Sequence, residues 1–436
     1  MSYDSFVDDS ALRRRAHRAH LADLMLTRQW LVRSFALLHG ASLLALLPII
    51  VGGEVLGDLP LYREWAIDAA AGDGVIGIHD DWVYPLLAWL PIGAANVLGP
   101  TAFQLVWLLM TTALNLWAVW VLSDGGRSRP GMIGAYVWLL GFLLLSPVAL
   151  LRLEGITGPL VIVALAWLAR RPLIAGALLA VATWIKVWPA MVILVIVAVC
   201  RERWRVIAAG VAVTAVTAGM SAASGGLAHL LSFLTTQTDR GLQLEAPIAT
   251  PWVWLAAMEV PGARVFQNRS LATREVTGPL DELAIAVATP LLVLVVVALA
   301  ALLAWAGRRG ADQRQLLLTG ALALVLAAIV CNKVGSPQYL LWVVPIAAVA
   351  MCQPTQWWRR TTAAVLATSL LTTIIFPIAY MPLVRLEWVP VALLSLRNGL
   401  LIALFLGAVL RLVQLGRGAT WEVAGVRGTR GAVVGS

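Results

Sequence analysis

The chain has 436 residues, of which 60% are hydrophobic and 13% are charged, and its mean hydropathy is +0.85. A soluble domain usually carries about 25% charged residues, so this composition excludes an ordinary soluble protein and predicts an all-α polytopic membrane protein. The net charge of +9 does not indicate a nucleic-acid partner, because the arginines lie in short loops between apolar runs, as they do in membrane proteins.

The first thirty-three residues carry six arginines before any apolar run begins. No small-residue cleavage site follows them, so they do not resemble a signal peptide. We therefore expect residues 1–33 to form a basic cytoplasmic segment. Part of it, from Ala11 to Arg33, is suited to an amphipathic helix that lies on the inner leaflet.

Apolar runs with the length of membrane helices follow. A spanning helix needs about 20 apolar residues, and fewer where it is broken. The first run covers 34–51, and the polar stretch 52–84 after it holds seven acids and one arginine. Residues 85–98 are apolar but few and contain Pro91, so we expect a juxtamembrane helix there. The other expected spans are 101–122, 131–149, 157–169, 172–186, 188–200, 206–223, 283–306, 315–331, 338–352, 361–381 and 390–412.

The distribution of arginine orients these spans. The segments expected inside hold twenty-two arginines, those expected outside hold seven, and the thirtieth, Arg397, lies within the last expected span. By the positive-inside rule, both termini are predicted to be cytoplasmic, with about twelve spans. The short runs 157–169 and 188–200 favour tilted or broken helices around a cavity. The expected divisions are the N-terminal segment 1–33, a transmembrane domain 34–412 with outer loops 52–100 and 224–282, and a cytoplasmic tail 413–436.

Only two residues of the chain are lysine, Lys186 and Lys333, against thirty arginines. Both lie at the edge of an apolar run, and the topology places both outside. An ammonium at membrane depth is costly and therefore suggests a function, and lysine suits a phosphate as a compact point charge. A compositional bias toward arginine, with lysines that snorkel to the interface, explains the pattern equally well.

Asp58 lies a few residues beyond the first span. At the mouth of an outward cavity, its carboxylate has the chemistry of a general base. The following Leu59-Pro60 also suits the start of a helix that Asp58 would cap, and the sequence fits both roles.

Four other outer segments carry clustered polar groups. Residues 79–81 suit a divalent ion or a sugar, or a solvated loop that caps the next helix. Residues 237–245 combine an arginine, a glycine, amides and acids, which suit hydroxyl groups, or form an ordinary surface turn. Residues 332–339 combine a lysine, a hydroxyl and an amide, which suit a phosphate or a sugar, and Arg152 with Glu154 is interpreted as a surface ion pair. The candidate ligand-binding residues are Asp81, Tyr84, Lys186, Arg240, Gln243, Glu245, Lys333, Gln338 and Tyr339.

No nucleotide-binding or metal-binding motif accompanies these clusters. The chain has no P-loop, no dinucleotide fingerprint and no histidine metal motif. Its three cysteines lack the spacing of a metal site or a disulfide framework. We therefore expect no cofactor, although a divalent metal is left open.

Several of these stretches together resemble glycosyltransferase family 87. They are the acid after the first span, Tyr84-Pro85-Leu86, Lys186-Val187-Trp188-Pro189, the 239–243 stretch and Asn332 to Trp342. No single motif is decisive, but their order and their common side carry a resemblance over roughly residues 40 to 400. One departure is Leu86, because the family often has Tyr-Pro-Pro at this place.

The resemblance implies a C-type glycosyltransferase fold in the plasma membrane of an actinobacterium, with the active site outside. It implies transfer, with inversion, of mannose or arabinofuranose from a polyprenyl-phosphate donor to an envelope glycolipid or polysaccharide. Asp58 would be the general base, and Lys333, Arg240 and Lys186 would bind the donor phosphate. Four aromatic residues would pack on the polyprenyl chain or the sugar, or form an interfacial belt; they are Trp184, Trp188, Tyr339 and Trp342.

Two other classes of protein compete with an enzyme. A transporter or lipid flippase also has intramembrane charges and broken helices, but it should place functional residues near the midplane, and the chain shows no convincing internal repeat. A structural subunit of an envelope complex would need none of these clusters. Convergence of Asp58, Arg240 and Lys333 on one outward cavity with a lateral opening to lipid separates the enzyme from both.

Overall fold

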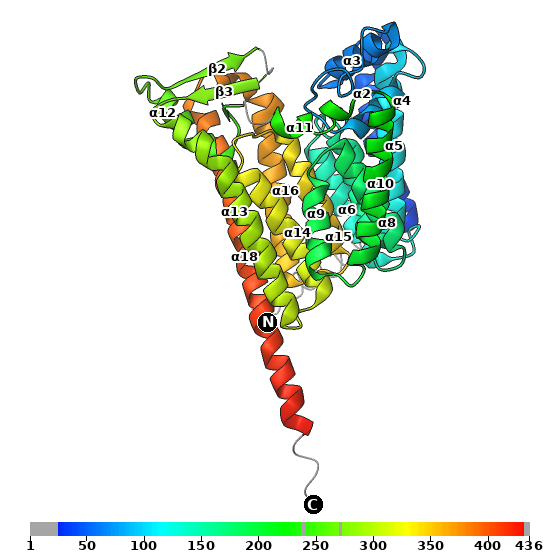
Figure 1. Cartoon of the computed structure of the whole chain (residues 1–436), viewed down its shortest axis with the longest axis vertical. Coiled ribbons are helices and arrows are strands. Elements are labelled where there is room, and N and C mark those ends of the chain that lie inside the picture. Colours follow the sequence, from blue (N-terminus) through cyan, green and yellow to red (C-terminus); the bar gives the residue numbers. More distant parts are fainter. Residues whose placement is uncertain (1–24, 237–239, 270–272, 431–436) are drawn as a thin grey trace, which may run out of the picture.

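The protein is a bundle of long, nearly aligned helices, as the computed structural model in Figure 1 shows. We describe residues 25–236, 240–269 and 273–430. Residues 1–24 and 431–436 lie outside this description, and with them most of the basic N-terminal segment and of its expected amphipathic helix. The first described helix, α2, begins at Arg28, so the last residues of that segment are helical.

Each of the twelve expected spans coincides with a helix. Within the described residues, seven helices are long and apolar enough to cross a membrane, and shorter apolar helices account for the other expected spans. The prediction of an all-α polytopic membrane protein is therefore confirmed. The bundle helices are α2 (Arg28–Val51), α5 (Phe103–Leu122), α6 (Arg129–Leu144), α7 (Glu154–Trp167), α8 (Pro172–Ile185), α9 (Pro189–Val199), α10 (Arg203–Ala223), α13 (Asp281–Arg308), α14 (Gln313–Val330), α15 (Leu340–Met351), α16 (Gln356–Thr373) and α18 (Trp388–Arg430).

The polar insertions gather at one end of the bundle, which we term the loop end. Figure 1 shows α3, α4, α11 and the strands there, opposite to the C-terminal end of α18. Residues 85–98 form the expected short helices. The elements of the loop end are α3 (Leu59–Ala71), η1 (Leu86–Ala88), α4 (Trp89–Ala95), η2 (Pro100–Ala102), η3 (Leu227–His229), α11 (Ser232–Thr235), η4 (Pro247–Ala249), α12 (Thr250–Ala257), η5 (Pro337–Tyr339), η6 (Ile374–Ile378) and α17 (Tyr380–Val384).

The long 224–282 insert contains a small antiparallel sheet that the sequence analysis did not predict. Its strands are β1 (Leu242–Gln243), β2 (Arg264–Asn268) and β3 (Thr273–Thr277), in the order β1-β3-β2. Gln243 pairs with Glu275 across β1 and β3. This pairing joins residues 242–243 to β3 within the insert.

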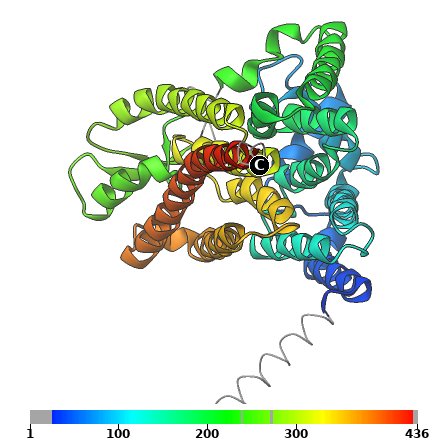
Figure 2. The ribbon, with the colours of Figure 1, turned by 90° about the horizontal axis from the view of Figure 1, so that it is seen from below.

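The centre of the bundle is formed by α7, α14 and α15. Nearly every residue of these three helices is buried. Their sequences are therefore apolar on all sides, as expected for helices surrounded by protein. Seen along the bundle in Figure 2, the helices of the first half of the chain lie on one side and those of the second half on the other.

Two helices depart from their expected bounds. α18 continues to Arg430, well beyond the expected boundary at residue 412. The expected span 361–381 is interrupted after α16, where Phe376 has non-helical dihedrals just before Pro377. A proline disfavours helical geometry in the residue before it, which accounts for the break.

Candidate active site at the loop end

The loop-end turns of the three central helices carry the polar side chains of the site. Arg152 and Glu154 precede and begin α7, Lys333 follows α14, and Gln338 precedes α15. These helices are too apolar and too tightly packed to hold unpaired charges, because an isolated buried charge costs many kcal/mol. Their charged residues are therefore displaced to the turns, where other loops provide partners.

Asp58 contacts Arg152 rather than capping a helix. α3 begins at Leu59, directly after Asp58, as the sequence predicts, but the Asp58 side chain makes no capping hydrogen bond. Its Oδ1 lies 3.1 Å from Nη2 of Arg152, and a quarter of the side chain is exposed. The carboxylate is thus held in place by an arginine and remains accessible.

The backbone before Asp58 is fixed by two contacts. Gly57 has a φ of +70°, and a Cβ atom there would lie 2.9 Å from Cβ of Leu151. The backbone N–H of Leu56 donates a 2.9 Å hydrogen bond to Gln104. Glycine adopts this φ without strain. Because it has no side chain, the segment can pack closely against Leu151, in the turn that carries Arg152.

Arg152 joins the first loop to the turn before α15. Its guanidinium donates to the side chains of Ser336, at 3.4 Å, and of Gln338. Burial alone would lower the pKa of Arg152, but the charges of Asp58 and Glu154 raise it above its ordinary value. Arg152 is therefore a permanent cation at the centre of the site.

Glu154 forms a separate ion pair with Lys186. The distance from Nζ of Lys186 to Oε1 of Glu154 is 3.2 Å, and Glu154 is fully buried. The same ammonium lies 4.4 Å from the ring centroid of Tyr84. The prediction of a surface ion pair between Arg152 and Glu154 is therefore wrong: they are two residues apart at the start of α7, and each pairs with a different loop.

Tyr84 and Tyr62 complete this side of the site. Their hydroxyl oxygens lie 3.4 Å apart. Burial raises the pKa of Tyr62, and the nearby Tyr84, Asp58 and Glu154 act in the same direction. Tyr62 is thus a neutral hydroxyl near Asp58, and no feature of the sequence distinguishes it as a site residue.

The 240–245 segment lies against the turn after α14. The backbone N–H of Gln243 donates to the carbonyl oxygen of Lys333 at 2.9 Å, and the Gln243 side chain accepts from the N–H of Gly335 at 3.1 Å. A Cβ atom on Gly335 would lie 2.3 Å from the backbone of Ala246. The two segments therefore approach more closely than a larger residue at position 335 would allow.

Arg240 and Lys333 lie on these two segments. Arg240 acts electrostatically on Tyr339, as Lys186 does. Its Nε is buried and makes no hydrogen bond to any described residue. Lys333 is buried, with 5% of its surface exposed. Part of the 237–245 motif, residues 237–239, falls outside the described residues.

Glu245 is held by a buried arginine of the last helix. Nη2 of Arg397, in α18, lies 3.1 Å from Oε2 of Glu245 and also donates to the Glu245 carbonyl oxygen. Burial raises the pKa of Glu245, and the positive charge of Arg397 opposes that shift. Glu245 therefore anchors the insert to α18.

Asp81 does not join the contacts described above. Its Oδ1 lies 2.7 Å from Nδ1 of His229, and more than half of its side chain is exposed. Among the described residues, no group of three or more His, Cys, Asp or Glu side chains is arranged to hold a metal ion. Asp81 thus links the first loop to the 227–229 turn.

The four aromatic residues expected at the membrane interface or on substrate are buried. Trp188 and Trp342 stack with centroids 6.2 Å apart, and Trp342 also stacks on Tyr339 at 3.9 Å. The indole N–H of Trp184 donates to Thr214. Trp188, Trp342 and Tyr339 thus form one stack, and Trp184 packs separately against α10.

The comparisons with known proteins are decisive for the family. The model for glycosyltransferase family 87 matches residues 82–331, more than half of the chain. The chain belongs to glycosyltransferase family 87. No curated protein matches the sequence. A solved structure similar to this one is apo ArnT from Cupriavidus metallidurans, with 14% identity, coverage of 84% of this chain and 73% of that chain, and a TM-score of 0.40.

Family 87 membership, together with the apolar helices of the bundle, makes the protein a membrane glycosyltransferase. It sets aside the transporter and structural-subunit alternatives. The matched range contains Tyr84, Arg152, Lys186, Arg240 and Gln243. Asp58 and the 332–339 turn lie outside the matched range. Asp58 contacts Arg152, and the turn contacts Arg152 and Gln243, which are both within it.

Substitutions of Lys186 and Glu154 should change stability and activity in different ways. Lys186→Met should destabilise the protein by about 3–5 kcal/mol, because it leaves a buried carboxylate without its partner. Lys186→Met combined with Glu154→Gln should restore much of the lost stability. Thermal unfolding in detergent measures this change, and transfer activity is assayed on the same samples.

If Lys186 contacts substrate, the double variant regains stability but not activity. A double variant with normal activity would show that the pair is only structural. Arg264, which is exposed on β2, offers a matched control: Arg264→Met also removes a positive charge at the loop end but should leave both stability and activity unchanged.

Proposed function

We propose that this glycosyltransferase transfers a sugar, with mannose preferred, from a polyprenyl-phosphate donor to an envelope glycolipid or polysaccharide, with inversion. The reaction takes place on the outer face of the plasma membrane, and both termini are cytoplasmic. One observation carries the proposal: Asp58, Arg152, the 333–339 turn and the 240–245 segment are joined by direct contacts at the loop end.

The arrangement supports a single displacement. Arg152 holds Oδ1 of Asp58, which leaves Oδ2 to accept the proton of the acceptor hydroxyl. The acceptor oxygen then bonds to the anomeric carbon as the bond from that carbon to the phosphate oxygen breaks. The bonding electrons leave with the phosphate, and the proton remains on Asp58.

The departing phosphate requires positive charge where its negative charge develops. Arg240 supports this role because its Nε is buried and has no hydrogen-bond partner among the described residues. Lys333 lies on the neighbouring turn, joined to the Arg240 segment through Gln243. Lys186 and Arg152 are each offset by a carboxylate, so they orient the site more than they add net charge to it.

Hydrogen-bonding groups around these cations suit a sugar. Tyr84, Gln243, Gln338 and Tyr339 lie on the turns that form the site, and we assign them to the donor sugar or its phosphate. We assign Glu245 and Asp81 to positions that hold the surrounding loops. An arabinofuranosyl donor remains the second candidate, because it presents the same polyprenyl phosphate to the cations.

Asp58→Asn should lower the turnover number by about 10²–10⁴, the range typical for loss of a general base. Binding of the polyprenyl-phosphate donor should be kept. The measurement is the transfer of radiolabelled mannose from polyprenyl-phosphate mannose, and in parallel of arabinofuranose from its donor, by the purified variant. Asp68→Asn, on the exposed face of α3, should behave as wild type. An Asp58→Asn enzyme with normal turnover would exclude Asp58 as the base.

Lys333→Ala should weaken use of the donor. Loss of a charge-assisted hydrogen bond costs about 1.5–3 kcal/mol, which corresponds to about a tenfold to hundredfold rise in the Michaelis constant for the polyprenyl-phosphate sugar. The acceptor constant should change little, and Lys333→Arg should recover part of the effect. Unchanged donor kinetics would instead mark Lys333 as a residue that only anchors its turn.

A further inference from the structure

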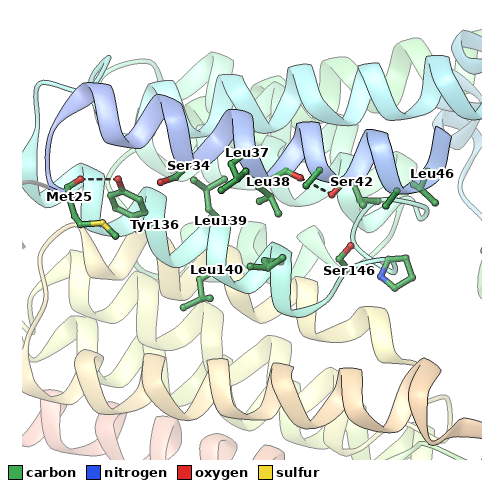
Figure 3. Close-up of a pocket in the computed structure, with 15 residues that line it drawn as sticks. Met25, Ser34, Leu37, Leu38, Ser42, Leu46, Tyr136, Leu139, Leu140 and Ser146 are labelled. Atoms are coloured by element: carbon green, nitrogen blue, oxygen red, sulfur yellow. Dashed lines mark hydrogen bonds between the residues drawn. The ribbon is translucent and has the colours of Figure 1, made fainter.

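An apolar groove runs along the outside of the bundle between α2 and α6. Its volume is about 780 Å³, within the range of small-molecule sites. Figure 3 shows side chains of the two helices facing each other across it, with Tyr136 at one end and Ser146 at the other. The side chains that line its wall include Leu37, Leu38, Ala41, Leu139, Leu140 and Leu143.

Two of the polar groups that line the groove form hydrogen bonds within the protein. The Tyr136 hydroxyl donates to the carbonyl oxygen of Met25 at 2.8 Å, and the Ser42 hydroxyl donates to that of Leu38 at 2.9 Å. The wall therefore offers mostly apolar surface to an occupant, with Ser34 and Ser146 as its other hydroxyl groups. Such a surface favours a hydrocarbon chain over a polar head group.

The groove is longer than one leaflet of a bilayer. Its lining on α2 extends from Ser34, at the cytoplasmic end of the first expected span, to Leu46, which is about 18 Å at the helical rise. The hydrocarbon core of a bilayer is about 30 Å thick, so one leaflet accounts for about half of that. One long alkyl or acyl chain that enters from the loop end would thus pass the middle of the bilayer as it fills the groove.

One end of the groove lies close to the turn that carries Arg152. Pro147 and Leu150 line that end, and Leu151 presses against Gly57, the residue before Asp58. Arg152, the next residue, contacts the Asp58 carboxylate. A lipid whose chain lies in the groove would therefore present its head group near the proposed base. The cations proposed for the donor phosphate, Arg240 and Lys333, belong to other segments, 240–245 and 333–339.

We propose that this groove binds the hydrocarbon chain of a lipid acceptor and so brings its sugar hydroxyl to Asp58. The proposal rests on the proposed function, because Asp58 distinguishes the acceptor side from the donor side. It identifies the acceptor as a glycolipid with at least one long alkyl or acyl chain. A soluble polysaccharide would make no use of this surface.

Two matched variants test the groove. Ala41 and Ala36 are both exposed on α2, but only Ala41 lines the groove. Ala41→Trp fills the groove without entering the core, and Ala36→Trp adds the same bulk on the other side of the helix.

The probe is hexadecyl mannoside with a photoreactive diazirine in its chain, applied to the full-length protein in nanodiscs. Labelled peptides are mapped by mass spectrometry. We expect labelling on α2 and α6, competition by unmodified hexadecyl mannoside, and about a tenfold loss of labelling in Ala41→Trp, equivalent to about 1.4 kcal/mol. Ala36→Trp should label as wild type.

Two results would overturn the proposal. Competition by polyprenyl phosphate, but not by hexadecyl mannoside, would assign the groove to the donor. Labelling that neither compound reduces, or that Ala41→Trp and Ala36→Trp leave equal, would show that only bulk lipid occupies it. Because labelling needs no turnover, an enzyme inactive with polyprenyl-phosphate donors that still labels as expected would contradict the proposed function but not the groove.

Discussion

Charged side chains can be kept in this apolar bundle only where they find partners, and this constraint determines where its chemistry lies. The central helices α7, α14 and α15 are buried along almost their whole length, and burial of an isolated charge is prohibitively costly. Arg152, Glu154 and Lys333 therefore occupy the turns at the ends of these helices. The loops that reach those turns provide the opposite charges and the amides, so the most tightly packed part of the fold also positions the site.

The turn between α6 and α7 is the main junction of the site. Arg152 forms an ion pair with Asp58 of the first loop, and Glu154 forms one with Lys186 of the turn after α8. Both partners come from segments far away in the sequence. Buried ion pairs contribute little net stability but fix geometry where both members are present. A carboxylate held by such a pair can be accessible and still precisely oriented, which is what a general base requires.

Much of the fold could be predicted from the sequence because the apolar runs and the arginine pattern are strong local signals. The bounds of α5, α8 and α9 agree with the expected spans within a few residues. The small sheet was missed because its strands are short and lie in a polar insert. α18 continues beyond residue 412 because arginines mark the expected membrane boundary and not the end of a helix.

The site was harder to predict because its pairs are long-range. Asp58 and Lys186 were selected from their positions beside apolar runs, and Arg240 from the amides and acids around it. Nothing local indicates that Asp58 pairs with Arg152. Arg152 and Glu154 were interpreted as each other's partners because they are neighbours in the sequence. Arg397 lies within an expected span, and a charge there indicates a buried acidic partner. That partner is Glu245.

The stereochemistry of transfer tests the central claim most directly. If Asp58 activates an acceptor that attacks opposite the departing phosphate, the product must have the anomeric configuration opposite to that of the donor. Nuclear magnetic resonance of the glycosidic product, formed from a polyprenyl-phosphate sugar of known configuration, measures this. Our account predicts complete inversion, and retention of configuration would contradict it, because retention requires a second displacement that a single carboxylate acting as base does not provide.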